Sequence, residues 1–250
     1  MPTPAKTVAA AAAKPRAARS GRAARASEDV QVVGREGRAY GGLAQEDRVA
    51  ARRARFVESG VELFGTQGFR GATVRGICAA AGLTDRYFYE SFASLEALLI
   101  EVHQSLMRGL SERLMVESVR SDAWRGGPAQ VERQVTIGYE IWFDFVREPR
   151  FARIVLAEIL GVSAAVDALY EQSMREFAEL TISPLESTQP GLKLSRPRRA
   201  MLGRALVGAA LQVAKMWMTT GYRAPRRDVV RTCVLVAMGT MSALASQARA

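Results

Sequence analysis

The stretch that decides the fold is TVRGICAAAGLTDRYFYESFASL, residues 73–95. Thr73 is a favourable N-cap residue, and apolar side chains recur after it at the spacing of a helix. Gly82 can adopt the left-handed backbone that ends a helix at no steric cost. Thr84 then caps a second short helix, with Asp85 in its first turn, where the helix dipole favours an anion. Two short helices joined by a tight turn predict a helix-turn-helix.

The second of these helices carries long polar and aromatic side chains outside its apolar face. Phe88 and Phe92 are spaced to face inward, which leaves Arg86, Tyr87 and Tyr89 outside. A helix that meets only solvent would be expected to carry Lys, Glu and Gln instead, and a helix of this kind fits the major groove of DNA. The pattern favours DNA binding, and the alternative is an ordinary helical hairpin in an all-α protein.

Residues 55–99 resemble the N-terminal domain of the tetracycline-repressor (TetR) family of bacterial transcription regulators. The resemblance is carried by short motifs in a fixed order: Phe64, Gly68-Phe69, Ala72-Thr73-Val74, Ala80-Ala81-Gly82-Leu83, Phe88-Tyr89, Phe92 and Glu96-Ala97-Leu98-Leu99. It implies a homodimeric repressor that binds palindromic double-stranded DNA and is released by a small apolar effector. The chain departs from the family at Leu95, where a basic residue often contacts phosphate, and at Ser91, where histidine is common.

The motif and the resemblance together assign DNA contacts to particular side chains. Base edges would be read by Asp85, Arg86 and Tyr87, with Arg86 as the main determinant, because arginine can form two hydrogen bonds with guanine. Phosphate contacts that position the domain are assigned to Thr73, Arg75, Thr84, Tyr89 and Ser94. One or two arginines at the start of the first helix are also expected to contact the DNA backbone: Arg48, Arg52, Arg53 and Arg55.

The composition favours an anionic partner. The 250 residues carry a formal net charge of +10. Residues 1–44 contribute half of this charge, with eight Lys or Arg against three acidic residues, so the remainder is only mildly basic. Residues 1–46 lack a repeating apolar face and are predicted to form a disordered basic tail, which either follows DNA phosphates or is simply solvated.

The residues present do not support catalytic or metal chemistry. The chain has one histidine, His103, and two cysteines, Cys78 and Cys233, which lie in apolar helical patterns. Buried free thiols fit a reducing, cytoplasmic compartment. The sequence contains no GxSxG, GxGxxG, phosphate-loop or HExxH motif. We therefore expect no enzymatic activity, no metal and no cofactor.

Helical periodicity predicts an all-α fold of about nine helices. Residues 47–97 would form the helix-turn-helix domain, and residues 98–250 a helical domain for ligand binding and dimerisation. Besides the two helices of the opening stretch, the expected helices are residues 46–66, 94–118, 129–147, 149–161, 163–182, 198–220 and 226–247. In the family, the helix that starts near residue 94 transmits the ligand signal to the DNA-binding domain.

Two further sites are expected in the helical domain. A small-molecule pocket would form among His103, Met107, Tyr139, Trp142, Phe143, Tyr170, Met174 and Phe177. The last two helices are apolar and rich in small residues, which suits a four-helix dimer interface through Leu206, Ala210, Val213, Val234, Met238 and Met241. A membrane hairpin is the rival interpretation, but the uncharged run 232–246 has 15 residues, short of the roughly 20 that a span needs.

Two functions remain as alternatives at this point. The first is a ligand-responsive DNA-binding regulator. The second is an all-α dimeric scaffold, or a non-specific DNA-binding protein, without a ligand response. Salt-dependent and sequence-selective DNA affinity would separate the two.

Overall fold

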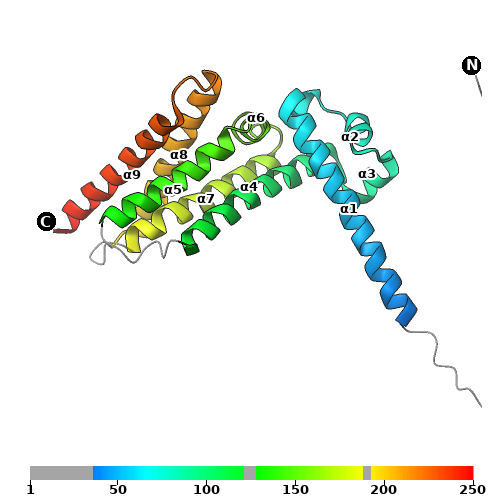
Figure 1. The fold of residues 1–250 in the computed structure, drawn as a ribbon, viewed down its shortest axis with the longest axis horizontal. Coiled ribbons are helices and arrows are strands. Elements are labelled where there is room, and N and C mark those ends of the chain that lie inside the picture. Colours follow the sequence, from blue (N-terminus) through cyan, green and yellow to red (C-terminus); the bar gives the residue numbers. More distant parts are fainter. Residues whose placement is uncertain (1–35, 121–127, 188–192, 250) are drawn as a thin grey trace, which may run out of the picture. The chain divides into compact units, whose positions relative to one another are not determined.

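The computed structural model describes residues 36–120, 128–187 and 193–249. Within these residues the chain forms helices and no strands, which confirms the predicted all-α fold (Figure 1). The elements are α1 (Glu36–Gln67), the 3₁₀ helix η1 (Phe69–Gly71), α2 (Val74–Ala81), α3 (Asp85–Ser91), α4 (Leu95–Arg120), α5 (Pro128–Val146), α6 (Pro149–Arg153), the π-helix η2 (Ile154–Glu158), α7 (Ala164–Ser187), α8 (Arg196–Thr219) and α9 (Arg226–Arg249).

The predicted tail is corrected at its C-terminal end. Helix α1 starts at Glu36 and not at Glu46, although its added turns contain Gly37, Gly41 and Gly42, which are weak helix formers. The remainder of the tail, residues 1–35, lies outside the described residues. The chain divides into two compact units, residues 1–42 and 43–250, and the second contains most of α1 and every later helix.

Helices α1, α2 and α3 form a small unit around buried aromatic rings, which we call the reader unit. Phe56 of α1 meets the edge of the Phe88 ring at a centroid distance of 5.5 Å and that of Phe92 at 6.3 Å. Phe56, Phe64 and Phe88 are completely buried. Edge-to-face aromatic packing adds to the stability that the buried area provides, so this cluster holds the two short helices against α1.

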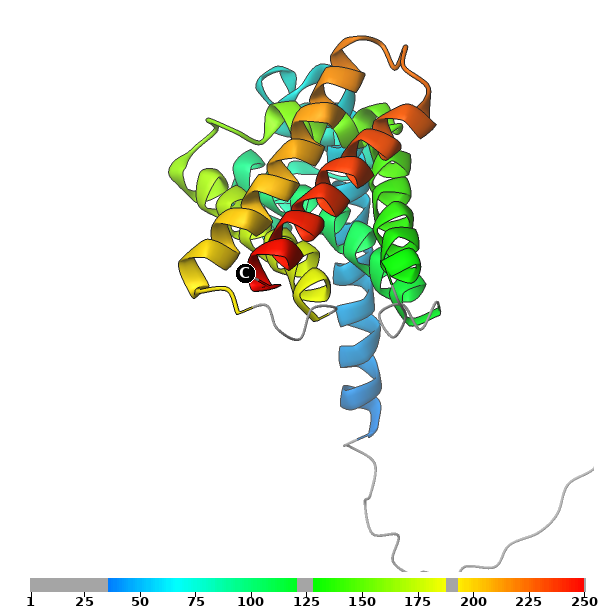
Figure 2. The same ribbon diagram turned by 90° about the vertical axis from the view of Figure 1, so that its left-hand side faces the viewer.

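The helices from α4 to α9 form a bundle, which we call the helical body. Helices α8 and α9 run side by side in opposite directions, as the orange and red ribbons of Figure 2 show. Helices α7 and α8 approach closely at Gly203, where an added Cβ would lie 2.7 Å from the carbonyl oxygen of Ala178. The turn between α8 and α9 is held by the Trp217 indole, which donates to the Ala224 carbonyl at 2.7 Å.

The segment from α6 to η2 belongs to both hydrophobic cores. Its residues Phe151 and Val155 pack in the core of the helical body. Ile154 and Ile159 pack instead in the core of the reader unit. Consecutive side chains point in different directions around a helix axis, so neighbouring residues of this segment can face two different cores. This segment therefore joins the two parts of the fold.

Helix α9 is the one described helix that is long and apolar enough to span a membrane by length and composition. Residues Arg226–Gln247 have a mean hydropathy of 1.6. The inward face of the helix, including Val229, Cys233 and Ala237, is buried in the chain's own cores. Packing inside the chain accounts for this face only, because Leu235 and Val236 on another face of α9 are exposed.

Candidate DNA-binding surface and ligand pocket

The turn between α2 and α3 has the geometry that its residues predict. The Thr73 hydroxyl accepts a hydrogen bond from the Gly76 N–H at 3.1 Å, as an N-cap does. Gly82 ends α2 with φ 61° and ψ 38°, in the left-handed region. The next N–H, that of Leu83, donates to the Cys78 carbonyl at 3.0 Å. These bonds satisfy backbone groups that the helix ends would leave unpaired.

Two arginines of α1 hold the C-terminal ends of both short helices. Arg55 donates to the Ala81 carbonyl at the end of α2, and Arg53 donates to the Ser91 carbonyl at the end of α3 at 2.6 Å. A cation is stabilised there by the negative end of the helix dipole. Arg53 also forms an ion pair with Glu101 of α4. Arg53 and Arg55, two of the four arginines predicted as possible DNA contacts, therefore form contacts within the chain.

The outer face of α3 presents Arg86 and Tyr89 most fully. The Arg86 side chain is 84% exposed and pairs with Glu90 one turn later at 2.9 Å. Tyr89 is 61% exposed. Tyr87 differs, because its ring is half-buried against the reader core and lies under the guanidinium of Arg52 at 4.5 Å. Of the side chains expected to read bases, Arg86 has the most freedom to reach a groove.

The remaining predicted DNA contacts lie on the same unit. Ser94 caps α4, since its hydroxyl accepts from the Ala97 N–H at 3.1 Å, and its own O–H is still able to donate to a phosphate. Thr84 and Arg75 are exposed, and Thr84 makes no capping hydrogen bond through its side chain. Asp85 lies beside the buried Cys78 thiol, whose pKa is raised to about 11 by burial and by this carboxylate.

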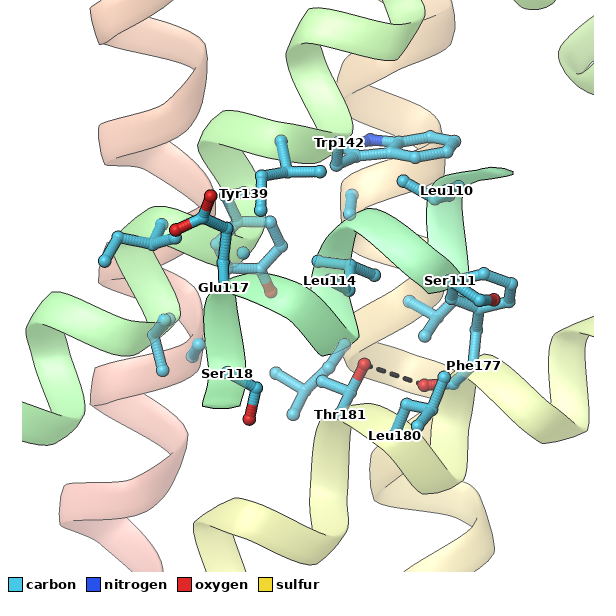
Figure 3. Close-up of a pocket in the computed structure, with 18 of the residues that line it drawn as sticks. Leu110, Ser111, Leu114, Glu117, Ser118, Tyr139, Trp142, Phe177, Leu180 and Thr181 are labelled. Carbon is cyan, nitrogen blue, oxygen red and sulfur yellow. Dashed lines mark hydrogen bonds between the residues drawn. The ribbon is translucent and has the colours of Figure 1, made fainter. Parts of the chain in front are cut away.

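A pocket lies between helices α4, α5, α7 and α8, with a cavity volume of about 400 Å³ (Figure 3). Five of the eight residues predicted for a pocket are in its lining: Met107, Tyr139, Trp142, Met174 and Phe177. Side chains that the sequence reasoning missed also line it, among them Leu110, Ser111, Leu114, Glu117, Thr181 and Leu211. The apolar stripe of α4, which continues through Leu110, is the signal that points to this wall.

Three predicted pocket residues do not line it. His103 lies one turn before Met107 with 1% exposure, and burial lowers its pKa to about 4, so it is a neutral core histidine. Phe143 points to α8, where its ring meets Trp217 at 5.6 Å. Tyr170 packs against the reader core. Helical periodicity did not determine which side of each helix faces the pocket. On α5, for example, Trp142 faces it and the next residue, Phe143, does not.

The pocket wall is connected to the reader unit through the α6–η2 segment. Val155 of η2 lines the pocket. One turn later, the Glu158 carboxylate accepts a hydrogen bond from the Phe69 N–H of η1 at 2.9 Å and pairs with Arg153 at 3.0 Å. Arg153 also donates to the Thr66 carbonyl at the end of α1. A change at Val155 therefore has a short path to the loop between α1 and α2.

Four of the six residues predicted for a dimer interface are buried inside the single chain, and the interface itself stays a prediction. Leu206, Ala210, Val234 and Met241 are buried within the chain's own cores, and Val213 and Met238 are partly buried there. Helices α8 and α9 are each apolar on more than one face, and the face with the more continuous apolar stripe packs against the rest of the chain. The exposed face of α8 and α9 carries Met201, Ala205, Gly208, Leu235, Val236 and Gly239. We call it the α8–α9 face.

The described residues contain no group of three or more His, Cys, Asp or Glu side chains placed to hold a metal ion. The candidate sites are therefore the surface of the reader unit, the pocket and the α8–α9 face. All three lie in the second compact unit of the chain, residues 43–250.

Residues 56–102 match the family model described as "Bacterial regulatory proteins, tetR family". Solved structures share the fold over most of the chain at low identity. A tetR-family transcriptional regulator from Streptomyces coelicolor has 20% identity and a TM-score of 0.61, covering 80% of this chain and 88% of that one. The regulator FadR from Bacillus subtilis, in complex with stearoyl-CoA, has 13% identity and a TM-score of 0.61, covering 74% and 97%. The fatty acid degradation regulator FadR from Bacillus halodurans has 16% identity and a TM-score of 0.60, covering 75% and 95%.

Proposed function

We propose that this chain, which belongs to the TetR family of bacterial regulatory proteins, is a cytoplasmic homodimeric repressor that a small apolar ligand releases from a palindromic operator. The proposal combines three features of one chain: a surface suited to DNA, a pocket, and a direct path between them. Each is supported by contacts between described residues.

The DNA-binding part of the proposal rests on the reader unit. Arg86 would read a base edge in the major groove, with Asp85 and Tyr87 beside it. The DNA phosphates would be contacted by Arg75 and by the hydroxyl groups of Thr73, Thr84, Tyr89 and Ser94. The first residue of α4 is the half-buried Leu95. Because this residue is a leucine, it contributes no positive charge to the DNA-binding surface. Hydroxyl groups and helix N-termini can bind phosphates without such a charge.

The observation that carries the ligand response is the position of the α6–η2 segment. Val155 lines the pocket, while Glu158 holds the N–H of Phe69 in the reader unit. A π-helix is a rare conformation that occurs frequently at functional sites, so this segment is the element on which we propose that a ligand against Val155 acts. A ligand can shift the equilibrium only if it binds the two states with different affinities.

DNA release would follow from a change in the distance between the two reader units of the dimer. In a twofold dimer on a palindrome, the two recognition helices lie about 34–36 Å apart, one turn of DNA. A ligand that favours another spacing lowers DNA affinity without entering the DNA surface. The α8–α9 face, with exposed Met201, Gly208 and Leu235, is the surface we assign to the dimer. Its small residues would allow the four helices to approach closely.

The pocket suits an apolar ligand, because its lining is dominated by aliphatic and aromatic side chains such as Leu110, Trp142 and Phe177. The FadR from Bacillus subtilis was solved with stearoyl-CoA, so compounds with long alkyl chains are the first probes. For this chain, such a ligand is part of the proposal.

The experiment that tests the proposal is a selection from random double-stranded DNA with the purified full-length protein, followed by titration of the enriched sequence at two salt concentrations. We expect a palindrome, affinity that falls steeply with salt, and loss of binding when alkyl-chain compounds are added. Binding without sequence preference would replace the regulator by a non-specific DNA-binding protein. The absence of any binding, with ligand-free protein, would favour the dimeric scaffold.

A further inference from the structure

The four arginines near the start of α1 differ in what their side chains contact. Arg53 and Arg55 donate hydrogen bonds to the carbonyl groups that end α3 and α2. Arg48 is exposed to solvent. Arg52 is half-buried, and its guanidinium carbon lies over the Tyr87 ring, 4.5 Å from the ring centroid. Arg52 is therefore held against α3 by an aromatic ring and not by an acceptor oxygen.

Stacking on a ring leaves the hydrogen-bond donors of an arginine available. The guanidinium meets Tyr87 with its flat face, whereas its N–H groups point outward in the plane of the group. Within the described residues, the Arg52 side chain forms no hydrogen bond and no ion pair. These N–H groups can bind two oxygens of one phosphate at once. Arg52 thus combines a fixed position with an unused capacity to bind an anion.

Helix α3 needs such a cation if it is to approach DNA. Its seven residues, Asp85–Ser91, contain the acidic Asp85 and Glu90 against one basic residue, Arg86. The helix alone therefore carries one net negative charge, and Arg86 is already paired with Glu90 at 2.9 Å. DNA phosphates repel a surface of this charge. The Arg52 guanidinium over Tyr87 adds the positive charge that brings the local sum to zero.

The position of Tyr87 places this charge at the edge of the DNA-binding surface. Tyr87 directly follows Arg86, whose side chain is 84% exposed, and it lies one turn after the exposed Thr84. We assign Arg86 to a base edge and Thr84 to a phosphate. When such a helix lies in the major groove, the phosphates of the two strands run along its sides. An arginine that reaches α3 from α1 approaches it from one of these sides.

We infer that Arg52 and Tyr87 form one phosphate-binding unit, which we call the Arg52–Tyr87 clamp. The Tyr87 ring positions the guanidinium, and the guanidinium binds one DNA phosphate beside α3. The inference rests on the proposed function for DNA as the partner. It selects one of the four arginines of α1 as a phosphate contact, and it gives Tyr87 a positioning role in addition to its place beside Arg86.

The test of the phosphate contact is the salt dependence of DNA binding by Arg52→Gln. Affinities of the full-length protein for the selected palindrome and for a mismatched DNA are measured at several salt concentrations. The slope of log affinity against log salt concentration should become shallower by about 0.9 for each bound chain. The change should be equal for both DNAs, because a phosphate contact carries no sequence information. A purely structural role of Arg52 would lower the affinity and leave the slope unchanged.

Arg175→Gln is the matched control for net charge. Arg175 is exposed on α7, outside the reader unit, so its replacement removes the same charge far from the clamp and should leave the slope unchanged. Thermal melting establishes that both variants are folded. Equal slopes in the wild type and in Arg52→Gln would overturn the inference, and so would an equal reduction of the slope in Arg175→Gln.

A double-mutant cycle tests whether Tyr87 positions Arg52. Tyr87→Leu keeps an apolar side chain but removes the ring, so the loss of affinity caused by Arg52→Gln should be about two- to fivefold smaller in this background. In the Tyr87→Phe background, which keeps the ring, the loss should equal that in the wild type. A loss of the same size in the wild type and in Tyr87→Leu would overturn the positioning role.

The clamp and the proposed function fail in different ways. If the wild type selects a palindrome but Arg52→Gln leaves the salt slope unchanged, the function stands and the clamp fails. If the wild type binds DNA without sequence preference and Arg52→Gln reduces the slope, the clamp stands and the sequence-specific function fails. If the wild type binds no DNA, both fail.

Discussion

The carboxylate of Glu158 accepts a hydrogen bond at 2.9 Å from the backbone N–H of Phe69, a residue 89 positions earlier in the chain. The contact needs Gly68, whose φ of 81° and missing side chain leave room for it, since an added Cβ would lie 2.7 Å from Glu158 Oε1. Arg153 completes the arrangement by binding both Glu158 and the Thr66 carbonyl. The end of α1 and the loop after it are thereby attached to the segment that lines the pocket.

Replacement of Glu158 by Ala should uncouple ligand binding from DNA release. The variant loses the bonds to Phe69 and Arg153, so we expect destabilisation of about 1–3 kcal/mol and weaker ligand-induced loss of DNA affinity. Ligand affinity should change little, since Glu158 is outside the pocket lining. Chemical denaturation and DNA titration with and without ligand measure these effects. Glu176→Ala, an exposed site on α7, is the control, and equal release by both variants would argue against this path.

Arg53→Gln should weaken DNA binding without removing a DNA contact. Arg53 binds the Ser91 carbonyl, pairs with Glu101 and lies over the Phe92 ring at 4.2 Å. Loss of these contacts should lower the free energy of unfolding by about 1–3 kcal/mol and loosen α3. Thermal melting and hydrogen exchange at α3 measure the effect. Arg48→Gln, at an exposed position of the same helix, is the control and should leave stability unchanged. If both variants lose the same stability, the loss comes from the removed positive charge and not from the contacts of Arg53.

Arg86→Ala should relax sequence preference at one position of each half-site. A bidentate arginine–guanine pair contributes about 1–3 kcal/mol of discrimination, so affinity for the selected sequence should fall while non-specific affinity stays similar. Parallel titrations with the selected DNA and with a mismatched DNA measure the difference. Glu90→Gln removes the partner of Arg86 but no base contact, so it should keep the preference. Unaltered discrimination in Arg86→Ala would assign base reading to another residue.

His103 should make stability depend on pH in the acidic range. Burial lowers its pKa to about 4 from the ordinary histidine value of 6.5. The folded state therefore resists protonation, and the unfolded state binds the proton first as pH falls. The contribution of His103 to the free energy of unfolding is therefore complete above pH 6.5. About 3 kcal/mol of this free energy is lost as the pH falls from 6.5 to 4. Urea denaturation at several pH values measures it. His103→Gln should flatten the slope in this window, and an unchanged slope would place its cause in other groups.

Leu235→Glu should produce a monomer. Leu235 is 73% exposed in the single chain and lies on the α8–α9 face, so a buried carboxylate in a dimer would be unpaired. Light scattering coupled to size-exclusion chromatography measures the mass. Leu160→Glu, at an exposed site away from this face, should leave the mass of the dimer unchanged. If Leu235→Glu is still a dimer, the dimer interface is not on the α8–α9 face.

The reader unit was predictable because its signals are local. The cap at Thr73 and the left-handed turn at Gly82 depend on single residues and their nearest neighbours, and both appear in the structure as predicted. The inward positions of Phe88 and Phe92 follow from helical spacing, and they too are buried. The arginines of α1 were not predictable in this way, since Arg55 and Ala81 meet across 26 residues.

The pocket was predictable in part for a similar reason. Helical spacing identified Trp142 and Phe177 as large side chains of the helical body, and both line the cavity. Spacing could not separate Trp142 from Phe143, because either can face inward until the neighbouring helix is known. The same ambiguity placed Leu206 and Val234 at an interface between subunits, although they pack inside the chain.

The sequence by itself determined the all-α fold, the helix-turn-helix and the apolar character of the last two helices, because these depend on capping, turn chemistry and periodicity along one segment. Only the tertiary structure decided which face of α8 and α9 is exposed, which large side chains line the pocket, and that Glu158 reaches Phe69. These outcomes depend on how helices rotate and pack against distant parts of the chain, and several faces of an apolar helix satisfy the same periodicity.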